Sequence, residues 1–358
     1  MELTLGKQLK ELPGPILITG HTGFKGTWLT LLLEKLNVPV LGLALAPEKD
    51  SLFDRAKRTG AIREAFIDIR DAAGVSQVLT ENQPSAVIHL AAQPLVMASY
   101  KTPRETFETN VMGTANVLDA SFRTSSVQAV VVATTDKVYR NDDLGRAFVE
   151  NDPLEGKDPY SASKVGTESV IAAWQQITKV SGGANVISVR AGNVIGGGDW
   201  AKDRLLPDLI RGFKSGVPIL IRNPQSTRPW QHVLDPLHGY LLALEAILSG
   251  LKLDSLNFGP AEESLSVREV AEIAAANWTQ KVALDFSNDS LKEQVEAKIL
   301  KLDSSKSLEV LGWKSIWSEP DAVKSTILWW HKVINESSPP NQQCLEDIDF
   351  MLEKITKL

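Results

Sequence analysis

Residues 15–45 read PILITGHTGFKGTWLTLLLEKLNVPVLGLAL: a short apolar run, a glycine-rich turn, a longer apolar stretch and a second short apolar run. Short runs of this kind that are rich in β-branched residues predict buried strands, and the longer stretch between them has the length of a helix. A strand, a helix and a second strand in this order form one βαβ unit with parallel strands. The segment therefore predicts the first unit of a parallel sheet.

The same alternation continues through the first two-thirds of the chain. Strands are predicted at residues 15–19, 39–45, 65–67, 86–90, 129–134 and 185–190. Helices are predicted at residues 23–36, 72–81, 103–123 and 159–179. Repeated βαβ units build a sheet with helices on both faces, so we expect an α/β fold with a Rossmann-like, doubly wound parallel sheet.

After Arg190 the pattern changes to a glycine loop at residues 196–198, followed by shorter pieces such as 217–222 and 235–248. We therefore expect a dinucleotide-binding Rossmann domain over residues 1–190. Residues 191–358 are expected to form mainly a smaller C-terminal substrate-binding region, some segments of which return to the first domain. Ser266 and Glu269 have the spacing of a capping box and predict a helix that runs through Asn277.

Composition narrows the classes of function. The chain has 38 Lys+Arg and 44 Asp+Glu, a net charge of −6, and 43% of its residues are hydrophobic, which excludes a disordered or fibrous protein. Its single cysteine, Cys344, excludes an intrachain disulfide framework and a multi-cysteine metal site. We expect a cytoplasmic protein that binds a small molecule and neither nucleic acid, a membrane nor a metal.

The glycine-rich turn directly follows the first predicted strand and opens the first predicted helix. Glycine lets the backbone approach a pyrophosphate, and the N–H groups at the helix start attract it. The turn predicts a dinucleotide site made by Gly20, Thr22, Gly23, Phe24, Lys25 and Gly26. An acidic residue for the adenosine ribose is expected at the end of the second strand, and none stands there. Glu48 or Asp50 could bind the ribose hydroxyls of NAD if the loop bends back, whereas Lys49 or Arg55 could bind the 2′-phosphate of NADP. The residues therefore leave the choice between NAD and NADP open.

Two later strand ends extend the predicted cofactor site. Asp68 is placed to hold the adenine amino group and Ile69 to cover the adenine face, although a solvated aspartate is the simpler interpretation. The fourth strand ends in small residues where a cofactor can pass close to the backbone, at Leu90, Ala91, Ala92 and Gln93. A tight turn would use the same residue types.

Tyr160 and Lys164 are four residues apart and therefore share one face of the helix predicted there. An ammonium near a phenol favours the phenolate, which is a base that can take a proton from a sugar hydroxyl. Thr135, Asp136 and Lys137 end the fifth strand, at the carboxyl edge where doubly wound sheets bind their ligands. Thr135 is expected to bond the hydroxyl that Tyr160 deprotonates, whereas a surface ion pair is the alternative for the two charged residues.

These motifs identify the chain as similar to the extended short-chain dehydrogenase/reductase superfamily of nucleotide-sugar enzymes. One branch is closer than the others. The segments that resemble the CDP-glucose 4,6-dehydratases are residues 20–26 (GHTGFKG), 89–96 (HLAAQPLV), 109–114 (TNVMGT), 190–200 (RAGNVIGGGDW) and 228–233 (RPWQHV). The likeness extends from about residue 16 to residues 311–313, and the segment between Tyr139 and Asp158 is shorter than in that branch.

The resemblance implies a lyase that uses NAD in an internal redox cycle. Tyr160 takes the C4 hydroxyl proton as hydride leaves C4, Asp136 protonates the departing C6 hydroxyl, and Lys137, or a water that it positions, removes the C5 proton. Hydride then returns to C6. Asp136 must be protonated and Lys137 neutral for these roles. The resemblance also adds Asn110, Thr134, Tyr160 and Lys164 to the cofactor site, and implies a homodimer in deoxysugar biosynthesis, such as that of the lipopolysaccharide O-antigen.

Donors in the second region are the candidates for binding the nucleotide diphosphate and ribose. They are Asn193, Arg204, Arg222, Arg228 and His232. The other histidines show no metal-ligand spacing, and a structural role is expected for each. Three alternatives stay open: another nucleotide-sugar 4,6-dehydratase, a nucleotide-sugar 4-epimerase, and a non-catalytic regulator that senses NAD(P). The Asp136-Lys137 pair argues against the epimerase, and the presence of Tyr160 and Lys164 argues against the regulator.

Overall fold

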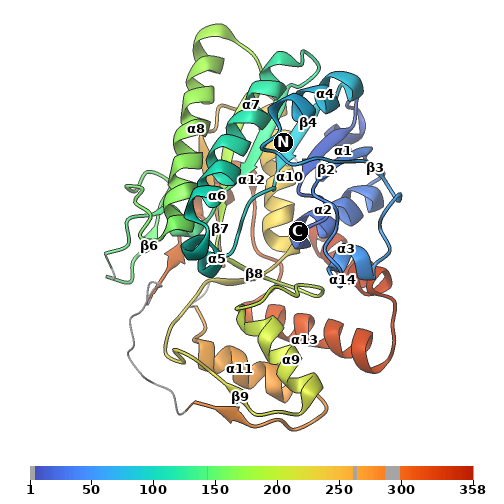
Figure 1. The fold of residues 1–358 in the computed structure, drawn as a ribbon, viewed down its shortest axis with the longest axis vertical. Coiled ribbons are helices and arrows are strands. Elements are labelled where there is room, and N and C mark those ends of the chain that lie inside the picture. Colours follow the sequence, from blue (N-terminus) through green and yellow to red (C-terminus); the bar gives the residue numbers. More distant parts are fainter. Residues whose placement is uncertain (1–4, 143, 261–263, 287–298, 358) are drawn as a thin grey trace.

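The computed structural model describes residues 5–142, 144–260, 264–286 and 299–357. Seven parallel strands form the central sheet in the order β11-β7-β5-β4-β1-β2-β3 (Figure 1). Their bounds are β1 Ile16–Thr19, β2 Val40–Ala44, β3 Arg63–Phe66, β4 Ala86–His89, β5 Ala129–Ala133, β7 Asn185–Ala191 and β11 Ser255–Phe258. From β1 and β4 at the centre, the strand order runs outward in two directions, through β2 to β3 and through β5 and β7 to β11. This order confirms the predicted doubly wound α/β fold.

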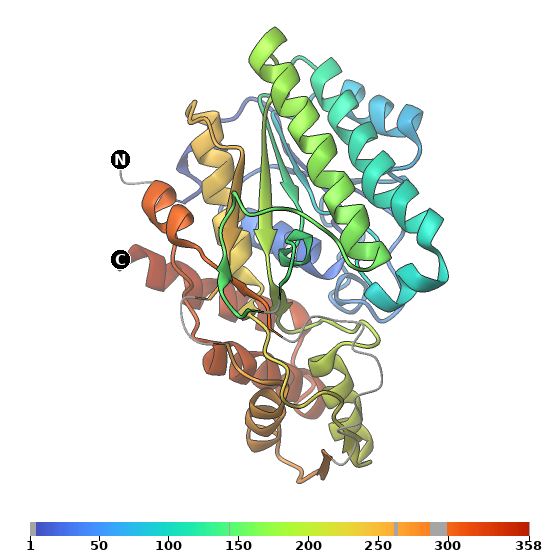
Figure 2. The same cartoon turned by 90° about the vertical axis from the view of Figure 1, so that its left-hand side faces the viewer.

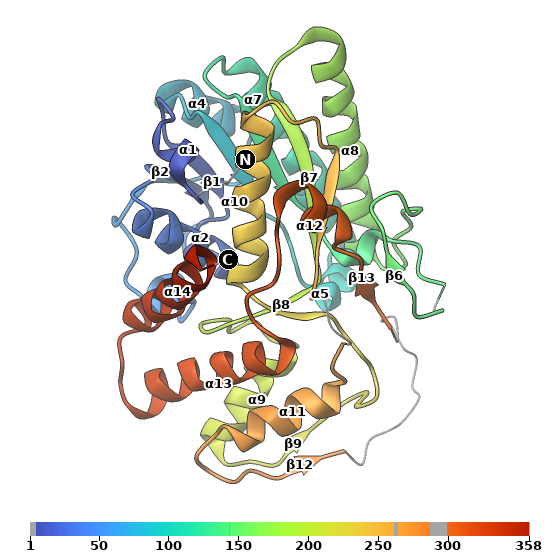
Figure 3. The same cartoon turned by 180° about the vertical axis from the view of Figure 1, so that it is seen from behind.

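Helices cover both faces of this sheet (Figures 1, 2 and 3). On one face lie α4 (Ala72–Asn82), α7 (Gly113–Arg123) and α8 (Pro159–Ser181); on the other lie α2 (Phe24–Lys35) and α10 (Leu234–Leu248). Side chains of β1 alternate between the two layers. Ile16 and Ile18 pack in the core with Trp28 of α2, and Leu17 packs in the core with Val75 of α4. All three strand residues are fully buried, which explains the uninterrupted apolar run in the sequence.

The helix predicted over residues 103–123 is present with these bounds, but it is not α-helical throughout. The structure divides the segment into α6 (Pro103–Phe107), a π-helical turn η1 (Glu108–Met112) and α7. The buried Asn110 of this turn donates to the Gln93 carbonyl and the Ser163 hydroxyl, and accepts from the Gln93 backbone N–H. These tertiary bonds support the wider turn, which local sequence periodicity does not reveal.

The later part of the chain contributes to the sheet and also to a separate layer of helices below it (Figure 3). β11 pairs with β7, and α10 packs against β5 and β7. The lower layer holds α9 (Leu205–Ser215), α11 (Val267–Ala276) and α13 (Glu319–Asn335), while α14 (Pro340–Thr356) returns to pack on α2. The capping box at Ser266 and Glu269 is present and confirms the helix predicted there. The division at residue 190 stays a prediction.

Shorter elements complete the described chain. The helical ones are α1 Lys7–Lys10, α3 Leu52–Arg55, α5 Val96–Lys101, the 3-10 turn η2 Asp136–Val138 and α12 Ser305–Leu311. The strands pair two by two: β8 Asn193–Ile195 with β10 Trp230–His232, β9 Ile219–Leu220 with β12 Leu284–Asp285, and β6 Ala147–Phe148 with β13 Lys301–Leu302. Over the described ranges, no helix is long and apolar enough to cross a bilayer.

The glycine-rich turn between β1 and α2 is tightly packed. Gly20 has φ +74°, and a Cβ there would lie 2.8 Å from the backbone nitrogen of Ala91. A Cβ on Gly26 would overlap the carbonyl oxygen of Gly20. The turn therefore requires glycine for two separate reasons, a left-handed backbone at Gly20 and a close backbone approach at Gly26.

We expect Gly26→Ala to lower the free energy of unfolding by about 2 to 4 kcal/mol, because the new methyl group meets a backbone oxygen that cannot move aside. Urea unfolding measures this change. Gly23→Ala is the matched control, because a Cβ there would lie 3.2 Å from the same oxygen, at the edge of ordinary contact. Equal losses for the two variants would contradict the packing described here.

Candidate active site

The glycine turn meets two other strand ends at the carboxyl edge of the sheet. The Thr22 hydroxyl donates to the carbonyl of Leu45, which follows β2, at 3.0 Å. Gly20 lies against Leu90 and Ala91, which follow β4. The π-helical turn adds Asn110, which joins the loop at Gln93 to Ser163 of α8. The structure therefore brings the turn, the small residues after β4 and the start of α8 to one edge.

α8 presents two of the predicted catalytic side chains at this edge. The helix begins after Asp158, whose carboxylate accepts from the backbone N–H of Ser161 at 2.9 Å, and Pro159 occupies its first turn. Tyr160 and Lys164 lie one turn apart and are both buried, with exposed fractions of 8% and 6%. The Lys164 ammonium donates to the carbonyl of Ala133, the last residue of β5, at 3.1 Å.

Burial determines the titration of both groups. It raises the pKa of Tyr160 to about 12, against the hydrogen bond from Thr135 and the charge of Arg204. Burial lowers the pKa of Lys164 to about 8, against the negative charge of Glu168. The net pKa of Tyr160 is therefore raised, where the spacing to Lys164 predicted a lowered one. The lysine gives a hydrogen bond to the strand end instead, and desolvation of the phenolate outweighs the favourable contacts.

The turn after β5 carries the other predicted catalytic residues. Asp136 begins η2 and is buried, and its carboxylate accepts from the Thr135 hydroxyl at 2.9 Å. The same hydroxyl oxygen accepts from the backbone N–H of Lys137 at 3.3 Å. Lys137 is half-buried. Thr135 thus contacts both this turn and Tyr160, which brings the two predicted catalytic segments together.

Lys25 approaches this group from the glycine turn. Its ammonium donates to the Tyr240 hydroxyl at 3.3 Å, and its pKa is lowered to about 7 by burial and by the charges of Arg204 and Lys164, against Asp136. Arg204, the residue before α9, pairs with Asp199 at 2.9 Å. Three basic side chains therefore surround the Tyr160–Asp136 region, an arrangement that favours an anionic ligand.

Comparison with known proteins agrees with this geometry. The family model for the NAD dependent epimerase/dehydratase family matches residues 16–259. The chain belongs to this family. A CDP-glucose 4,6-dehydratase of Salmonella typhimurium is 41% identical over 326 residues, which cover 88% of this chain and 90% of that protein.

More distant members of the NAD-dependent epimerase/dehydratase family share the fold. A UDP-glucose 4-epimerase of Lacticaseibacillus casei is 25% identical and covers 74% of this chain and 82% of its own. The crystal structure of the dTDP-glucose 4,6-dehydratase DesIV from Streptomyces venezuelae, with NAD and TYD bound, has a TM-score of 0.75 at 23% identity. That alignment covers 91% of this chain and 99% of DesIV.

The remaining predicted cofactor residues lie at the same edge but have protein partners. The Asp68 carboxylate pairs with Arg70 at 2.6 Å, and this bond is the main cause of its lowered pKa. Ile69 is buried and packs against Gly113 of α7. Thr134 donates to Glu168 at 2.5 Å.

The predicted substrate residues fall into two groups. The first group is Arg204, which lies near Tyr160. The second is Asn193 and Arg228: Asn193 of β8 pairs with Trp230 of β10, and the buried Arg228 lies two residues before Trp230. Arg222 and His232 are not brought to these residues. Arg222 is largely exposed and lies 3.9 Å from Asp203. His232 is fully buried, and its ring stacks on Trp317 and lies edge to face with Trp28.

Sequence reasoning missed three residues that support the site. Tyr240 contacts Lys25, and no local pattern signals this because residues 234–247 of α10 are all buried and Tyr240 does not differ from its neighbours in this respect. Glu168 and Arg190 form a buried ion pair at 2.8 Å behind Lys164. Glu168 could have been found, because it continues the four-residue spacing of Tyr160 and Lys164.

Proposed function

We propose that this chain catalyses the NAD-dependent dehydration of CDP-glucose to CDP-4-dehydro-6-deoxyglucose. The observation that carries the proposal is the meeting of Thr135 and Asp136, in the turn after β5 that also carries Lys137, with Tyr160 on α8. Oxidation at C4 needs only the tyrosine, whereas elimination of water also needs an acid and a base. The 41% identity with the Salmonella CDP-glucose 4,6-dehydratase supports the same reaction and the same nucleotide.

The residues present fit a dinucleotide. Gly23 caps α2 without a side-chain hydrogen bond and Gly26 lies in its first turn, so the N–H groups there can approach a pyrophosphate. We assign the dinucleotide to the following residues: Gly20, Thr22, Gly23, Phe24, Lys25, Gly26, Asp68, Ile69, Leu90, Ala91, Ala92, Gln93, Asn110, Thr134, Tyr160 and Lys164. A dinucleotide held by these residues would supply the hydride acceptor for C4 and the hydride donor for C6.

In the first step Tyr160 removes the proton of the C4 hydroxyl. Its raised pKa means that the phenol must be helped to ionise, and the Thr135 hydrogen bond and the positive charge of Arg204 act in that direction. Lys164, held against Ala133 one helical turn away, supplies a further positive charge. With substrate bound, the Thr135 hydroxyl would bond the reacting hydroxyl in place of the Asp136 carboxylate that it contacts in this structure.

In the second step Asp136 protonates the C6 hydroxyl as it leaves, and Lys137, or a water that it positions, removes the C5 proton. The 4-ketone acidifies this proton, and one water is lost. Asp136 is buried, and its role requires that the carboxyl group be protonated when it acts. Lys25 has a pKa of about 7 and is therefore only partly charged at neutral pH. It stabilises the ionised form of Asp136 less than a full positive charge would.

For the nucleotide we assign the diphosphate and ribose to Asn193, Arg204 and Arg228. Arginine binds phosphate oxygens through two parallel hydrogen bonds. The product is a 4-keto-6-deoxy sugar nucleotide, so the reaction belongs to deoxysugar biosynthesis, and we place it in the supply of O-antigen sugars. The buried thiol of Cys344 and the lack of any other cysteine fit a reducing cytoplasm.

Incubation with CDP-glucose in heavy water tests the reaction. We expect loss of one water and gain of one solvent deuterium at C5, because the C5 proton is exchanged during elimination. Mass spectrometry of the sugar product, with and without added NAD, measures both changes. An unchanged substrate mass combined with the appearance of galactose would establish a 4-epimerase instead, and no conversion of several nucleotide sugars would favour a non-catalytic binder.

Two substitutions separate the steps. Tyr160→Phe removes the base for C4 oxidation and should lower the rate by at least about 100-fold. Asp136→Asn should leave C4 oxidation in place and slow elimination, so that a 4-keto sugar with its C6 hydroxyl accumulates. Rapid-quench analysis of sugar intermediates distinguishes the two. Tyr100→Phe, at an exposed tyrosine of α5, is the matched control and should retain activity. Loss of C4 oxidation in Asp136→Asn would refute its assigned role.

We also infer a homodimer. Large apolar side chains are exposed on α5, α6 and η1, which adjoin one another and α8: Met97 is 50% exposed, Phe107 41% and Met112 56%. A second copy of the chain, packed on these helices, would remove this surface from water. Light scattering on the purified protein should give about twice the mass of the chain, and Met112→Glu should shift the mass toward the monomer. A monomeric parent protein would refute the inference.

A further inference from the structure

Glu168 is the third member of the helical row that begins with Tyr160 and Lys164. Its carboxylate is buried, with an exposed fraction of 6%, and it accepts four hydrogen bonds. Oε1 accepts from the Thr134 hydroxyl at 2.5 Å, the Ser188 hydroxyl at 2.7 Å and Nε of Arg190 at 2.8 Å, and Oε2 accepts from Nη2 of Arg190 at 2.8 Å. Lys164 and Glu168 thus hold the end of β5 at two successive residues, through the carbonyl of Ala133 and the hydroxyl of Thr134.

Arg190 extends this connection to the turn that carries Asp136 and Lys137. Its Nη1 donates to the Tyr139 hydroxyl at 2.8 Å, and that hydroxyl donates to Oδ1 of Asn257 at 2.7 Å. Tyr139 directly follows η2. One buried ion pair therefore joins α8, the ends of β5 and β7 and the turn after β5.

The charge of Glu168 also acts on Lys164. The titratable groups near Lys164 are Lys25 of α2, His89 of β4, Tyr160 and Glu168 of its own helix, and Arg190 lies beyond Glu168 on β7. His89 is neutral at ordinary pH, because burial lowers its pKa to about 3. Burial favours a neutral Lys164, and the negative charge of Glu168 opposes it. The other carboxylate of this group is Asp136 of η2, which acts on Lys25 and Tyr160.

We propose that Glu168 is a positioning residue for the proposed reaction: its buried carboxylate keeps the Lys164 ammonium charged and holds the strand end at Thr134 and Thr135 beside Tyr160. The inference rests on the proposed function for its catalytic meaning. Its action on Lys164 can be measured without substrate.

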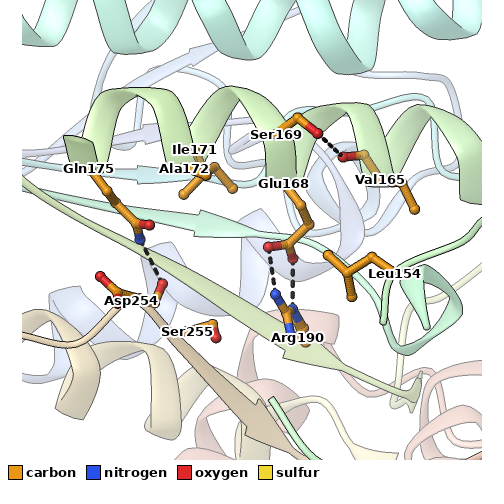
Figure 4. A pocket seen from close by; sticks show the side chains of 10 residues that line it. All are labelled: Leu154, Val165, Glu168, Ser169, Ile171, Ala172, Gln175, Arg190, Asp254 and Ser255. Atoms are coloured by element: carbon orange, nitrogen blue, oxygen red, sulfur yellow. Dashed lines mark hydrogen bonds and ion pairs between the residues drawn. The ribbon is translucent and has the colours of Figure 1, made fainter. Parts of the chain in front are cut away.

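A cavity of about 340 Å³ reaches the ion pair from behind (Figure 4). Glu168 and Arg190 line it, together with Leu154 and the chain at Asp254 and Ser255. The figure shows Arg190 pointing up to the Glu168 carboxylate, with Ser169 turned away along the helix. Loss of the Glu168 side chain would enlarge this space, so a small carboxylate such as formate has room beside Arg190.

The test is competitive acetylation of Lys164 with acetic anhydride over a range of pH, read by peptide mass spectrometry on the full-length protein. Only the neutral amine reacts. In Glu168→Gln we expect the pH of half-labelling to fall by about one unit, because the amide lacks the charge. The amide oxygen can still accept from Thr134, Ser188 and Nε of Arg190, and only the bond from Nη2 of Arg190 is lost. Ser169→Ala is the matched control on the same helix and cavity, since the Ser169 hydroxyl bonds only its own helix at Val165. It should label like the parent.

A folded Glu168→Gln protein with the parent midpoint would overturn the proposal. Glu168→Ala provides a second arm: it should show the lowered midpoint, and added formate, but not an equal concentration of chloride, should restore it. Should neither variant fold, Glu168→Asp carries the test. It retains the charge one methylene further away, and an unchanged midpoint and unchanged activity would overturn the proposal.

Activity gives the last comparison. In an active parent enzyme, the high-pH fall in kcat for dehydration should move to lower pH in Glu168→Gln by the same amount as the labelling midpoint. A merely structural role would lower kcat without moving this limb. If the parent does not dehydrate CDP-glucose while the labelling midpoint still shifts, the proposed function fails and the action of Glu168 on Lys164 stands.

Discussion

The buried ion pair between Glu168 and Arg190 sets the position of one helix relative to two strands, and the candidate active site depends on that position. Tyr160 and Lys164 are useful only if α8 places them at the end of β5, and the ion pair joins α8 to the ends of β5 and β7. Removing one partner of such a pair leaves an uncompensated charge in the interior, which typically costs about 3 to 5 kcal/mol. The pair therefore couples the stability of the fold to the geometry of the site.

The candidate site next to the Glu168–Arg190 ion pair has an excess of positive charge. Lys25, Lys164 and Arg204 surround Asp136 and Tyr160, and burial lowers the pKa of both lysines. A folded protein tolerates this arrangement because the lysines can release protons, whereas the arginine is balanced by Asp199. The same excess of positive charge suits a dinucleotide and a sugar diphosphate. Their negative charges would replace part of the hydration that the buried basic side chains have lost.

Close backbone packing places the parts of the site next to one another. Gly20 lies against Ala91, and Gly26 against Gly20, so the turn after β1 and the loop after β4 share one surface. The π-helical turn gives Asn110 a position from which it reaches both that loop and α8. The contacts of Gly20 with Ala91 and of Asn110 with Ser163 join segments that are far apart in the sequence, and both lie at the carboxyl edge of the sheet.

The sequence by itself determined the sheet and much of the site, because the signals for both are local. Six of the seven sheet strands, the glycine turn, and the Tyr160 and Lys164 pair were predictable from short apolar runs, a turn between strand and helix, and a four-residue spacing. Tertiary structure alone decided the rest. β11 joins the sheet beside β7, the helix over residues 103–123 widens at Asn110, and Lys25 meets Tyr240 across the fold. Burial, too, is a property of the folded chain: it raises the pKa of Tyr160 where the motif indicated a lower one, and it encloses His232 between Trp28 and Trp317, which no local pattern indicated. Spacing along the chain fixes which side chains share a face, but desolvation and contacts between distant segments depend on how the faces pack together.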